Sequence, residues 1–283
     1  LLREGGCAVV TSDSTLLAAV KSQLRSLSGP PRVLVTFGSD EGAAIRVTEC
    51  SQSFEGVHLT LNDRSTHKLP LLGLHNALNA AAAIGVARRL GLSTEDARSG
   101  LAAVKGPPMR LECSTVAGVR IINDAYNANP ESMLAPIGTF EQVVGTDQSL
   151  RGSRRVVVLG DMLELGTQAP ALHREVLEAA MHARCADVLI LVGTHMAQAG
   201  AELRICHEPG VHFFPDMAPP RDTHAAGLLQ PGDVVLLKGS RGMGLERVAT
   251  ALQKGVPRAE PKPMPTMSQT STATGGGVSM QEG

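Results

Sequence analysis

The stretch that decides the fold runs from Ile121 to Pro130 and reads Ile-Ile-Asn-Asp-Ala-Tyr-Asn-Ala-Asn-Pro. The apolar run from Val119 to Ile122 predicts a short strand that leads into it. Asn129 followed by Pro130 is typical of a helix start, with asparagine as the N-cap and proline at the first helical position. The stretch therefore predicts a strand-to-helix connection that holds a carboxylate and several amides.

The helix that follows this connection is expected to bury one face. The apolar residues that recur at helical spacing are Met133, Ile137, Phe140 and Val144, and Pro136 is a point where the helix can kink. Backbone N–H groups at such a helix start can meet an anion or a ribose phosphate. An ordinary Asx-rich turn explains the stretch taken alone equally well. The only tyrosine of the chain, Tyr126, lies inside it and favours a site.

Composition excludes several classes of protein. With 283 residues, 43% hydrophobic content and a net charge of -1, the chain is typical of a globular protein with two modest domains. The near-neutral charge and the low aromatic content argue against nucleic-acid binding. No apolar run is long enough for a membrane span, and the first residues do not resemble a signal peptide. We expect a monomer in the cytoplasm, or in the plastid stroma if the source is a photosynthetic eukaryote.

The chain starts at Leu1 in what reads as the middle of a domain, so we expect a fragment of a longer protein. Its cysteines are odd in number, and none forms a C-x-x-C pair or a zinc-ligand cluster. We interpret them as reduced thiols of an intracellular protein, and as small buried hydrophobes: Cys7, Cys50, Cys113, Cys185 and Cys206.

The first part of the chain predicts a mixture of strands and helices. Short apolar runs between turn-forming residues predict strands at Cys7 to Thr11, Val33 to Phe37, Ala44 to Val47 and Val57 to Leu61. Helical spacing predicts helices at Leu16 to Leu24, capped by Thr11 to Ser14, at an Ala-rich segment that opens with Gly73-Leu74-His75-Asn76, and at Thr94 to Val104.

Asn76 and Asn79 are three residues apart, so they share one face of the Ala-rich helix near its start. Two amides there can read the donor and acceptor edge of a base such as adenine. Capping of the first helical turn explains the same pair equally well.

The string Lys105-Gly106-Pro107-Pro108 is a strong helix stop, and we place a domain boundary there. The predicted domains are residues 1–106 and 107–256. Arg110 stands at this hinge, where its guanidinium can reach a phosphate, although a lone arginine is more often a surface charge. From Pro257 to residue 283 the composition predicts a disordered tail.

The second domain predicts a doubly wound, mainly parallel α/β sheet. Its continuous apolar runs are typical of strands buried on both faces: Val156 to Leu159, Val188 to Val192 and Val234 to Leu237. Helical patterns lie between and after them: Ala171 to Arg184, Thr194 to Arg204, Arg221 to Leu229 and Leu245 to Gln253.

Each of these three strands runs into a glycine, and polar residues follow. Ligands of open α/β sheets bind at the carboxyl ends of strands. The candidates at those ends are Asp161, Thr194, Lys238, Ser240 and Arg241. The chain has neither a dinucleotide fingerprint nor a G-x-x-x-x-G-K-[ST] phosphate loop. An alternative is that each glycine only allows a tight turn after its strand. This explains each strand end alone, but it does not explain why polar groups follow all three.

Taken together, five ordered strings resemble the Mur ligase family over roughly residues 7–255. They are Gly73-Leu74-His75-Asn76 with Asn79, Arg110-Leu111-Glu112, Asn123 to Pro130, Leu159 to Gly166, and Lys238-Gly239-Ser240-Arg241. The strings around Tyr126 and Asp161 are most similar to members that join D-alanyl-D-alanine to a UDP-N-acetylmuramoyl-tripeptide. Met109 departs from the family, which usually has glycine before the hinge arginine.

The resemblance implies a chain that holds the end of a central ATPase domain and a Rossmann-like C-terminal domain. It implies that ATP phosphorylates the carboxylate of the UDP-linked muramoyl peptide, and that the amine of D-alanyl-D-alanine attacks the acyl phosphate. The phosphate loop and the Mg²⁺ ligands are then expected before Leu1, so the isolated chain is expected to be inactive.

Residue roles follow only from this resemblance. The nucleotide-binding residues it implies are His75, Asn76, Asn79, Arg110 and Asp124. The substrate-binding residues it implies are Tyr126, Asn127, Asp161, Lys238, Ser240 and Arg241.

Two further hypotheses stay open: a non-catalytic nucleotide- or peptide-binding remnant, and a ligase like folylpolyglutamate synthase, which fits the string around Tyr126 less well.

Overall fold

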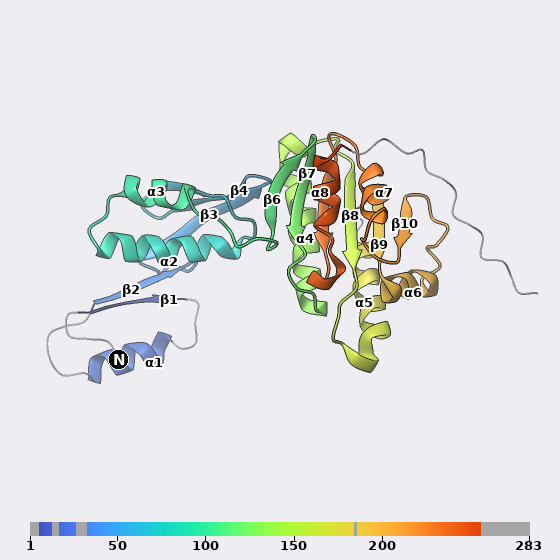
Figure 1. Cartoon of the computed structure of the whole chain (residues 1–283). Helices are drawn as coiled ribbons and strands as arrows, with labels where there is room; N and C mark the ends of the chain where they lie inside the picture. Colours follow the sequence, from blue (N-terminus) through green and yellow to red (C-terminus); the bar gives the residue numbers. More distant parts are fainter. Residues whose placement is uncertain (1–5, 13–16, 27–32, 184–185, 256–283) are drawn as a thin grey trace, which may run out of the picture.

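The computed structural model describes residues 6–12, 17–26, 33–183 and 186–255, and these form two α/β units that lie side by side (Figure 1). Each unit has its own sheet, with the strand orders β1-β2-β3-β4-β5 and β10-β9-β8-β11-β7-β6. The chain passes from the first unit to the second between Ala102 and Glu112. The predicted α/β class is confirmed, and the predicted tail lies outside the described residues.

The first sheet combines parallel and antiparallel pairs. Its strands are β1 (Cys7–Thr11), β2 (Val33–Gly38), β3 (Ile45–Ser53), β4 (Gly56–Leu61) and β5 (Thr66–Leu69). The first three are parallel, and β4 and β5 continue from β3 as antiparallel neighbours. β3 extends well beyond the predicted Ala44 to Val47. The prediction stopped short because the residues from Thr48 to Ser51 are exposed and mostly polar. β5 was not predicted, since four residues are too few to reveal an alternating pattern.

The helices of the first unit are α1 (Leu17–Ser26), α2 (His75–Arg89) and α3 (Thr94–Ala102). The core beneath α2 is made by its alanines and Ile84, which pack against Ile45, Leu59 and Leu61. Small side chains let this helix approach the sheet closely. α1, α2 and α3 confirm the three predicted helices, while residues 13–16, which include part of the predicted cap, lie outside the described ranges.

The second sheet is parallel except at one edge. Its strands are β6 (Glu112–Val116), β7 (Val119–Asp124), β8 (Arg155–Gly160), β9 (Val188–Val192), β10 (Val211–Phe214) and β11 (Val234–Lys238). Only β6 runs antiparallel to its neighbour. The three apolar runs predicted as buried strands are β8, β9 and β11, and they are confirmed. β6 and β10 were not predicted, because outermost strands are partly solvent-exposed and have no continuous apolar run.

Helices cover both faces of this second sheet, so the doubly wound prediction is confirmed (Figure 1). One face packs on α4 (Pro130–Thr146), α5 (Ala169–His182) and α6 (Thr194–Glu202), and the other on α7 (Arg221–Gly227) and α8 (Arg247–Gln253). Within β8, Val157 and Val158 belong to opposite cores, as expected for successive residues of a strand. The short 3-10 turns are η1 (Gln148–Leu150), η2 (Gly166–Gln168) and η3 (Arg241–Met243).

α4 begins where the sequence predicts. The Asn129 side chain accepts a hydrogen bond from the backbone N–H of Ser132, and the Ser132 hydroxyl accepts one from the N–H of Asn129, which completes a capping box. The helix runs through Pro136, which is buried. The apolar residues predicted to face the core are buried, except for Val144. Its neighbour Val143 is buried instead.

The two units meet at the turn between β3 and β4, which lies against α4. Gln52 is buried there, and its amide Nε2 donates to Gln142 Oε1 on α4 at 2.8 Å. Its Oε1 accepts from the N–H of Gly73, just before α2, at 3.0 Å. The backbone N–H of Phe54 donates to the Asp147 carboxylate at 2.8 Å. One buried amide therefore connects the start of α2 to the second unit.

Replacing Gln52 with Ala should lower the free energy of unfolding by about 1–3 kcal/mol, because the N–H of Gly73 then lacks its acceptor. Urea unfolding measures the change. The matched control is Gln198→Ala on the exposed side of α6, where Gln198 donates to Glu202 one helical turn away and a change within about 0.5 kcal/mol is expected. Equal unfolding midpoints for the two variants would show that Gln52 does not tie the units together.

Candidate functional site

The strands of the second sheet end at one common edge. In the parallel register Lys238 lies beside Asp124 on one side and beside Leu159 on the other, and Gly160 lies beside Val192. The segments that follow these strands therefore gather at the carboxyl edge of the sheet. They carry the polar residues that the sequence singles out there: Asp124, Tyr126, Asn127, Asp161, Thr194, Ser240 and Arg241.

The ammonium of Lys238 is the centre of this edge. Its side chain is only 1% exposed, and Nζ lies 3.0 Å from Asp124 Oδ2. Nζ also donates to the carbonyl oxygen of Asp124 at 3.1 Å and to that of Asn127. Burial lowers the pKa of Lys238, and the charge of Asp124 opposes that shift. All three N–H donors of the ammonium thus have acceptors, which lie at the end of β7 and in the turn that follows it.

Asp124 also holds the segment that enters the second unit. Its other oxygen, Oδ1, accepts from the backbone N–H of Leu111 at 2.8 Å. Met109 and Leu111 both have left-handed backbone conformations, with φ of 58° and 50°. A left-handed φ is strained for residues with a side chain, which is the physical reason why glycine suits position 109. Asp124 therefore helps to fix a strained segment around Arg110.

Two arginines lie close to the ring of Tyr126. The guanidinium carbon of Arg110 lies 4.4 Å from the centre of its ring, and that of Arg241 lies 5.6 Å away. The backbone N–H of Tyr126 donates to the carbonyl of Met109 at 3.1 Å. Tyr126 is 40% exposed, and both arginines are exposed as well. The structure thus brings together one predicted nucleotide-binding residue and two predicted substrate-binding residues.

Asp161 and Ser240 have internal partners. The Asp161 carboxylate accepts from the N–H groups of His195 and Met196 at 3.1 and 2.8 Å, at the start of α6. The Ser240 hydroxyl accepts from the N–H of Leu163 at 2.9 Å. Gly193 is required here, because a Cβ at this position would lie 2.3 Å from the Asp161 carboxyl carbon. These contacts favour a supporting role for both side chains.

His173 is a supporting residue that the sequence reasoning missed. It is completely buried, its Nε2 accepts from the N–H of Met162 at 2.8 Å, and its Nδ1 lies 2.6 Å from the carbonyl oxygen of Ala169. These partners require a neutral ring with the proton on Nδ1. A single histidine within an amphipathic helix gives no sequence signal for this role.

The amides of the first unit lie near the start of α2. Asn79 Nδ2 donates to Asn76 Oδ1 at 3.0 Å, and Asn76 Nδ2 donates to the carbonyl of Leu72 at 2.8 Å. His75 and Asn79 are exposed. Asn76 and Asn79 are thus in contact, as their spacing predicts. The amide of Asn76 also bonds to the backbone just before the helix.

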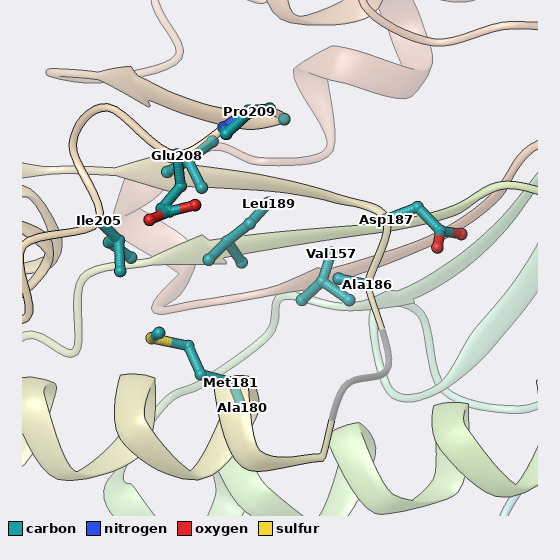
Figure 2. A pocket seen from close by; sticks show the side chains of 11 residues that line it. Val157, Ala180, Met181, Ala186, Asp187, Leu189, Ile205, Glu208 and Pro209 are labelled. Atoms are coloured by element: carbon teal, nitrogen blue, oxygen red, sulfur yellow. The ribbon is translucent and has the colours of Figure 1, made fainter.

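A cavity of about 250 Å³ lies elsewhere, at the amino ends of β9 and β10 (Figure 2). Figure 2 shows Leu189 and Met181 among its apolar walls, with Asp187 and Glu208 toward its sides. Asp187 is paired with Arg155. Because the carboxyl edge is at the opposite end of the strands, this cavity is separate from the candidate site.

Two other features bear on the class of protein. None of the helices in the described part of the chain combines the length and apolar character that a bilayer crossing requires. The described residues also bring no three His, Cys, Asp or Glu side chains together as a metal-binding group. The cysteines that the structure describes are free thiols, but the prediction that they are buried is wrong, because Cys50, Cys113 and Cys206 are exposed and Cys7 is half-buried.

Two family models match the chain. The Mur ligase middle domain matches residues 1–87, and the domain described as Mur ligase, glutamate ligase domain matches residues 109–241. The UDP-N-acetylmuramoyl-tripeptide–D-alanyl-D-alanine ligase of Bacillus subtilis (strain 168) is 34% identical over 263 residues, which cover 89% of this chain and 52% of the relative. The chain thus spans about half the length of that curated relative.

Solved structures agree with this match. MurF from Acinetobacter baumannii superimposes with a TM-score of 0.70 at 26% identity, over 89% of this chain and 53% of that one. A folylpolyglutamate synthase from Thermotoga maritima gives a TM-score of 0.62 at 14% identity, over 90% of this chain and 56% of that one, and shares the fold.

Burial lowers the pKa of His173 from its ordinary value of 6.5. A histidine with a lowered folded-state pKa binds protons more readily when unfolded, so stability should fall as the pH drops below about 6.5. Replacing His173 with Gln should reduce the difference in unfolding free energy between pH 7.5 and 5.5, measured by urea unfolding at each pH. His67 and His212 shift in the same direction and retain part of the effect. An unchanged pH dependence in the variant would contradict a neutral, buried His173.

Proposed function

Since this chain belongs to the Mur ligase family, we propose that it forms part of an ATP-dependent ligase that adds D-alanyl-D-alanine to UDP-N-acetylmuramoyl-tripeptide. The sequence similarity to the Bacillus subtilis enzyme of that name supports this substrate pair. The observation that carries the proposal is the cluster of Lys238, Asp124 and the two arginines at the carboxyl edge, beside the segment that joins the units. This is where open α/β sheets bind their ligands.

The proposed reaction has two steps. ATP transfers its terminal phosphoryl group to the peptide carboxylate, which gives ADP and an acyl phosphate. The free amine of D-alanyl-D-alanine then attacks the acyl carbon, an amide bond forms, the amine loses a proton, and inorganic phosphate leaves. Positive charge near the phosphoryl group and the acyl phosphate favours both steps.

We assign the nucleotide to the junction between the two units. His75, Asn76 and Asn79 present ring and amide groups for adenine, whereas Arg110 and Asp124 offer a cation and a carboxylate for the ribose and phosphates. Mg²⁺ supplies charge neutralisation for phosphoryl transfer when it is bound. We assign its ligands, with the phosphate loop, to sequence before residue 1, as the resemblance to the family implies.

We assign the acceptor side to Tyr126, Asn127 and Arg241, whose side chains are exposed at the carboxyl edge. Asp161, Lys238 and Ser240 border the same site, where their internal hydrogen bonds support a role in holding the ligand-facing residues. We place the reaction in the cytoplasm, where ATP is available.

The direct test compares two proteins. The polypeptide of residues 1–283 should release no phosphate above background from ATP, the tripeptide substrate and D-alanyl-D-alanine, because phosphoryl transfer needs a phosphate loop and Mg²⁺ ligands. A chimera that places the N-terminal half of the Bacillus subtilis relative before residue 1 should release phosphate only when the dipeptide is present. A chimera that folds and binds ATP but never forms the amide would support the alternative of a non-catalytic binding remnant.

In the active chimera, Asp124→Asn should raise the apparent KM for ATP about ten-fold or more, since a charged hydrogen bond contributes on the order of 1.5 to 3 kcal/mol. The comparison is informative because asparagine preserves an Asx turn. Asp63→Asn, on the surface of the first unit, is the control. If the KM for ATP of the Asp124→Asn chimera is unchanged, Asp124 does not bind the nucleotide and has a structural role alone.

A further inference from the structure

We propose that His173 is a positioning residue of the ligase reaction: its neutral ring holds residues 161–166 in place and, through them, the turn that carries Arg241. This role rests on the proposed function. It adds a residue that has no access to either substrate, because His173 lies on α5 and is completely buried.

The ring of His173 connects α5 to the segment that leaves β8. Its Nδ1 lies 2.6 Å from the carbonyl oxygen of Ala169, one turn earlier in the same helix. Its Nε2 accepts from the backbone N–H of Met162 at 2.8 Å, and both partners of this bond are buried. A buried N–H group requires an acceptor. The position of Met162 therefore depends on the acceptor that His173 provides.

Residues 161–166 are bonded in turn to the segment that leaves β11. The N–H of Leu163 donates to the Ser240 hydroxyl at 2.9 Å, and the N–H of Ser240 donates to the carbonyl of Asp161 at 3.1 Å. Ser240 directly precedes Arg241, which begins η3. A displacement of residues 161–166 is therefore passed on to a side chain that we assign to the acceptor side.

The two segments are packed with little room for adjustment. A Cβ at Gly239 would lie 2.9 Å from the Cα of Gly160, and a Cβ at Gly242 would lie 2.9 Å from the side chain of Leu163. Glu164 has a left-handed φ of 65°, which is strained for a residue with a side chain. Strained backbone keeps its conformation only where the surrounding contacts fix it. The bond from Met162 to α5 is one of these contacts.

The contact requires the neutral form of His173. A proton on Nε2 would face the N–H of Met162, and two donors cannot bond to each other. The titratable groups that face the ring are Asp161, whose Oδ1 lies 3.8 Å from Nε2, and His195, whose ring centre lies 5.0 Å away. Burial lowers the pKa of His173 from 6.5, which keeps the ring neutral at pH 7. Acid should therefore charge the ring, draw it toward the Asp161 carboxylate and release Met162.

The first test needs no ligase activity. Hydrogen exchange of the 1–283 polypeptide at pH 7, read by mass spectrometry, follows residues 161–166 and 239–244. His173→Leu removes the acceptor and should raise the exchange rate of both segments about ten-fold or more. His173→Gln should restore most of the protection, because its Oε1 accepts where Nε2 does. The matched control is His182→Leu: His182 also bonds to the carbonyl one turn earlier in α5, but it is exposed.

The second test uses the active chimera. His173→Leu should raise the apparent KM for D-alanyl-D-alanine about ten-fold or more and leave the KM for ATP within about two-fold, because the groups assigned to the nucleotide lie at the junction of the units. His173→Gln should restore the KM for the dipeptide. Below pH 6.5, kcat/KM for the dipeptide should fall further in the parent chimera than in His173→Gln, since glutamine takes up no proton there.

Several outcomes would overturn the proposal. Unchanged exchange in His173→Leu would show that His173 does not hold residues 161–166. Faster exchange with both KM values unchanged would leave His173 a structural role alone. If His173→Leu does not fold, an identical acid limb in the parent and in His173→Gln would reject the role. The proposed function fails separately: an inactive chimera, in a chain that shows the expected exchange pattern, contradicts the function and leaves the contact between the segments intact.

Discussion

The buried ammonium of Lys238 is the constraint on which the carboxyl edge of the second sheet depends. A charge that is 1% exposed is tolerated only when its hydrogen-bonding groups and its charge are matched. Here the matching groups come from the end of β7 and the turn after it: the carboxylate and carbonyl of Asp124 and the carbonyl of Asn127. Because β7 and β11 are neighbours in the sheet, the lysine at the end of one strand determines the path of the chain that leaves the other.

The pair of Lys238 and Asp124 also holds the segment that joins the two units. Asp124 holds the N–H of Leu111, and the turn places Tyr126 beside Met109, so the strained segment around Arg110 is fixed from two sides. The interface at Gln52 then connects the start of α2 to the second unit. Groups that we assign to the nucleotide and to the acceptor are therefore positioned by two sets of polar contacts, one at Lys238 and one at Gln52. A ligase that joins two substrates needs such a connection, since its reacting groups come from different parts of the chain.

Much of this fold could be predicted from the sequence, because strands buried on both faces leave continuous apolar runs and capped helices leave Asn-Pro or Ala-rich signals. The edge strands β6 and β10 could not, since solvent on one side removes the apolar run. The polar residues predicted at the strand ends do gather at one edge of the second sheet, while their binding roles stay predictions. What the sequence could not show was the use of each side chain: Asp161 caps a helix and His173 supports a turn, and both bonds form only once the tertiary fold brings the partners together.

The most direct test of this account is the substitution Lys238→Met, with Lys254→Met on the surface as its control, followed by urea unfolding monitored through Tyr126 fluorescence. The account predicts a loss of about 3–5 kcal/mol in unfolding free energy, because Asp124 is left as an unpaired, partly buried carboxylate. It also predicts that the emission of Tyr126 in the folded state shifts toward that of free tyrosine, since the turn is no longer held. A Lys238→Met protein with the stability of the control and an unchanged folded-state emission would contradict the claim that this ammonium organises the site.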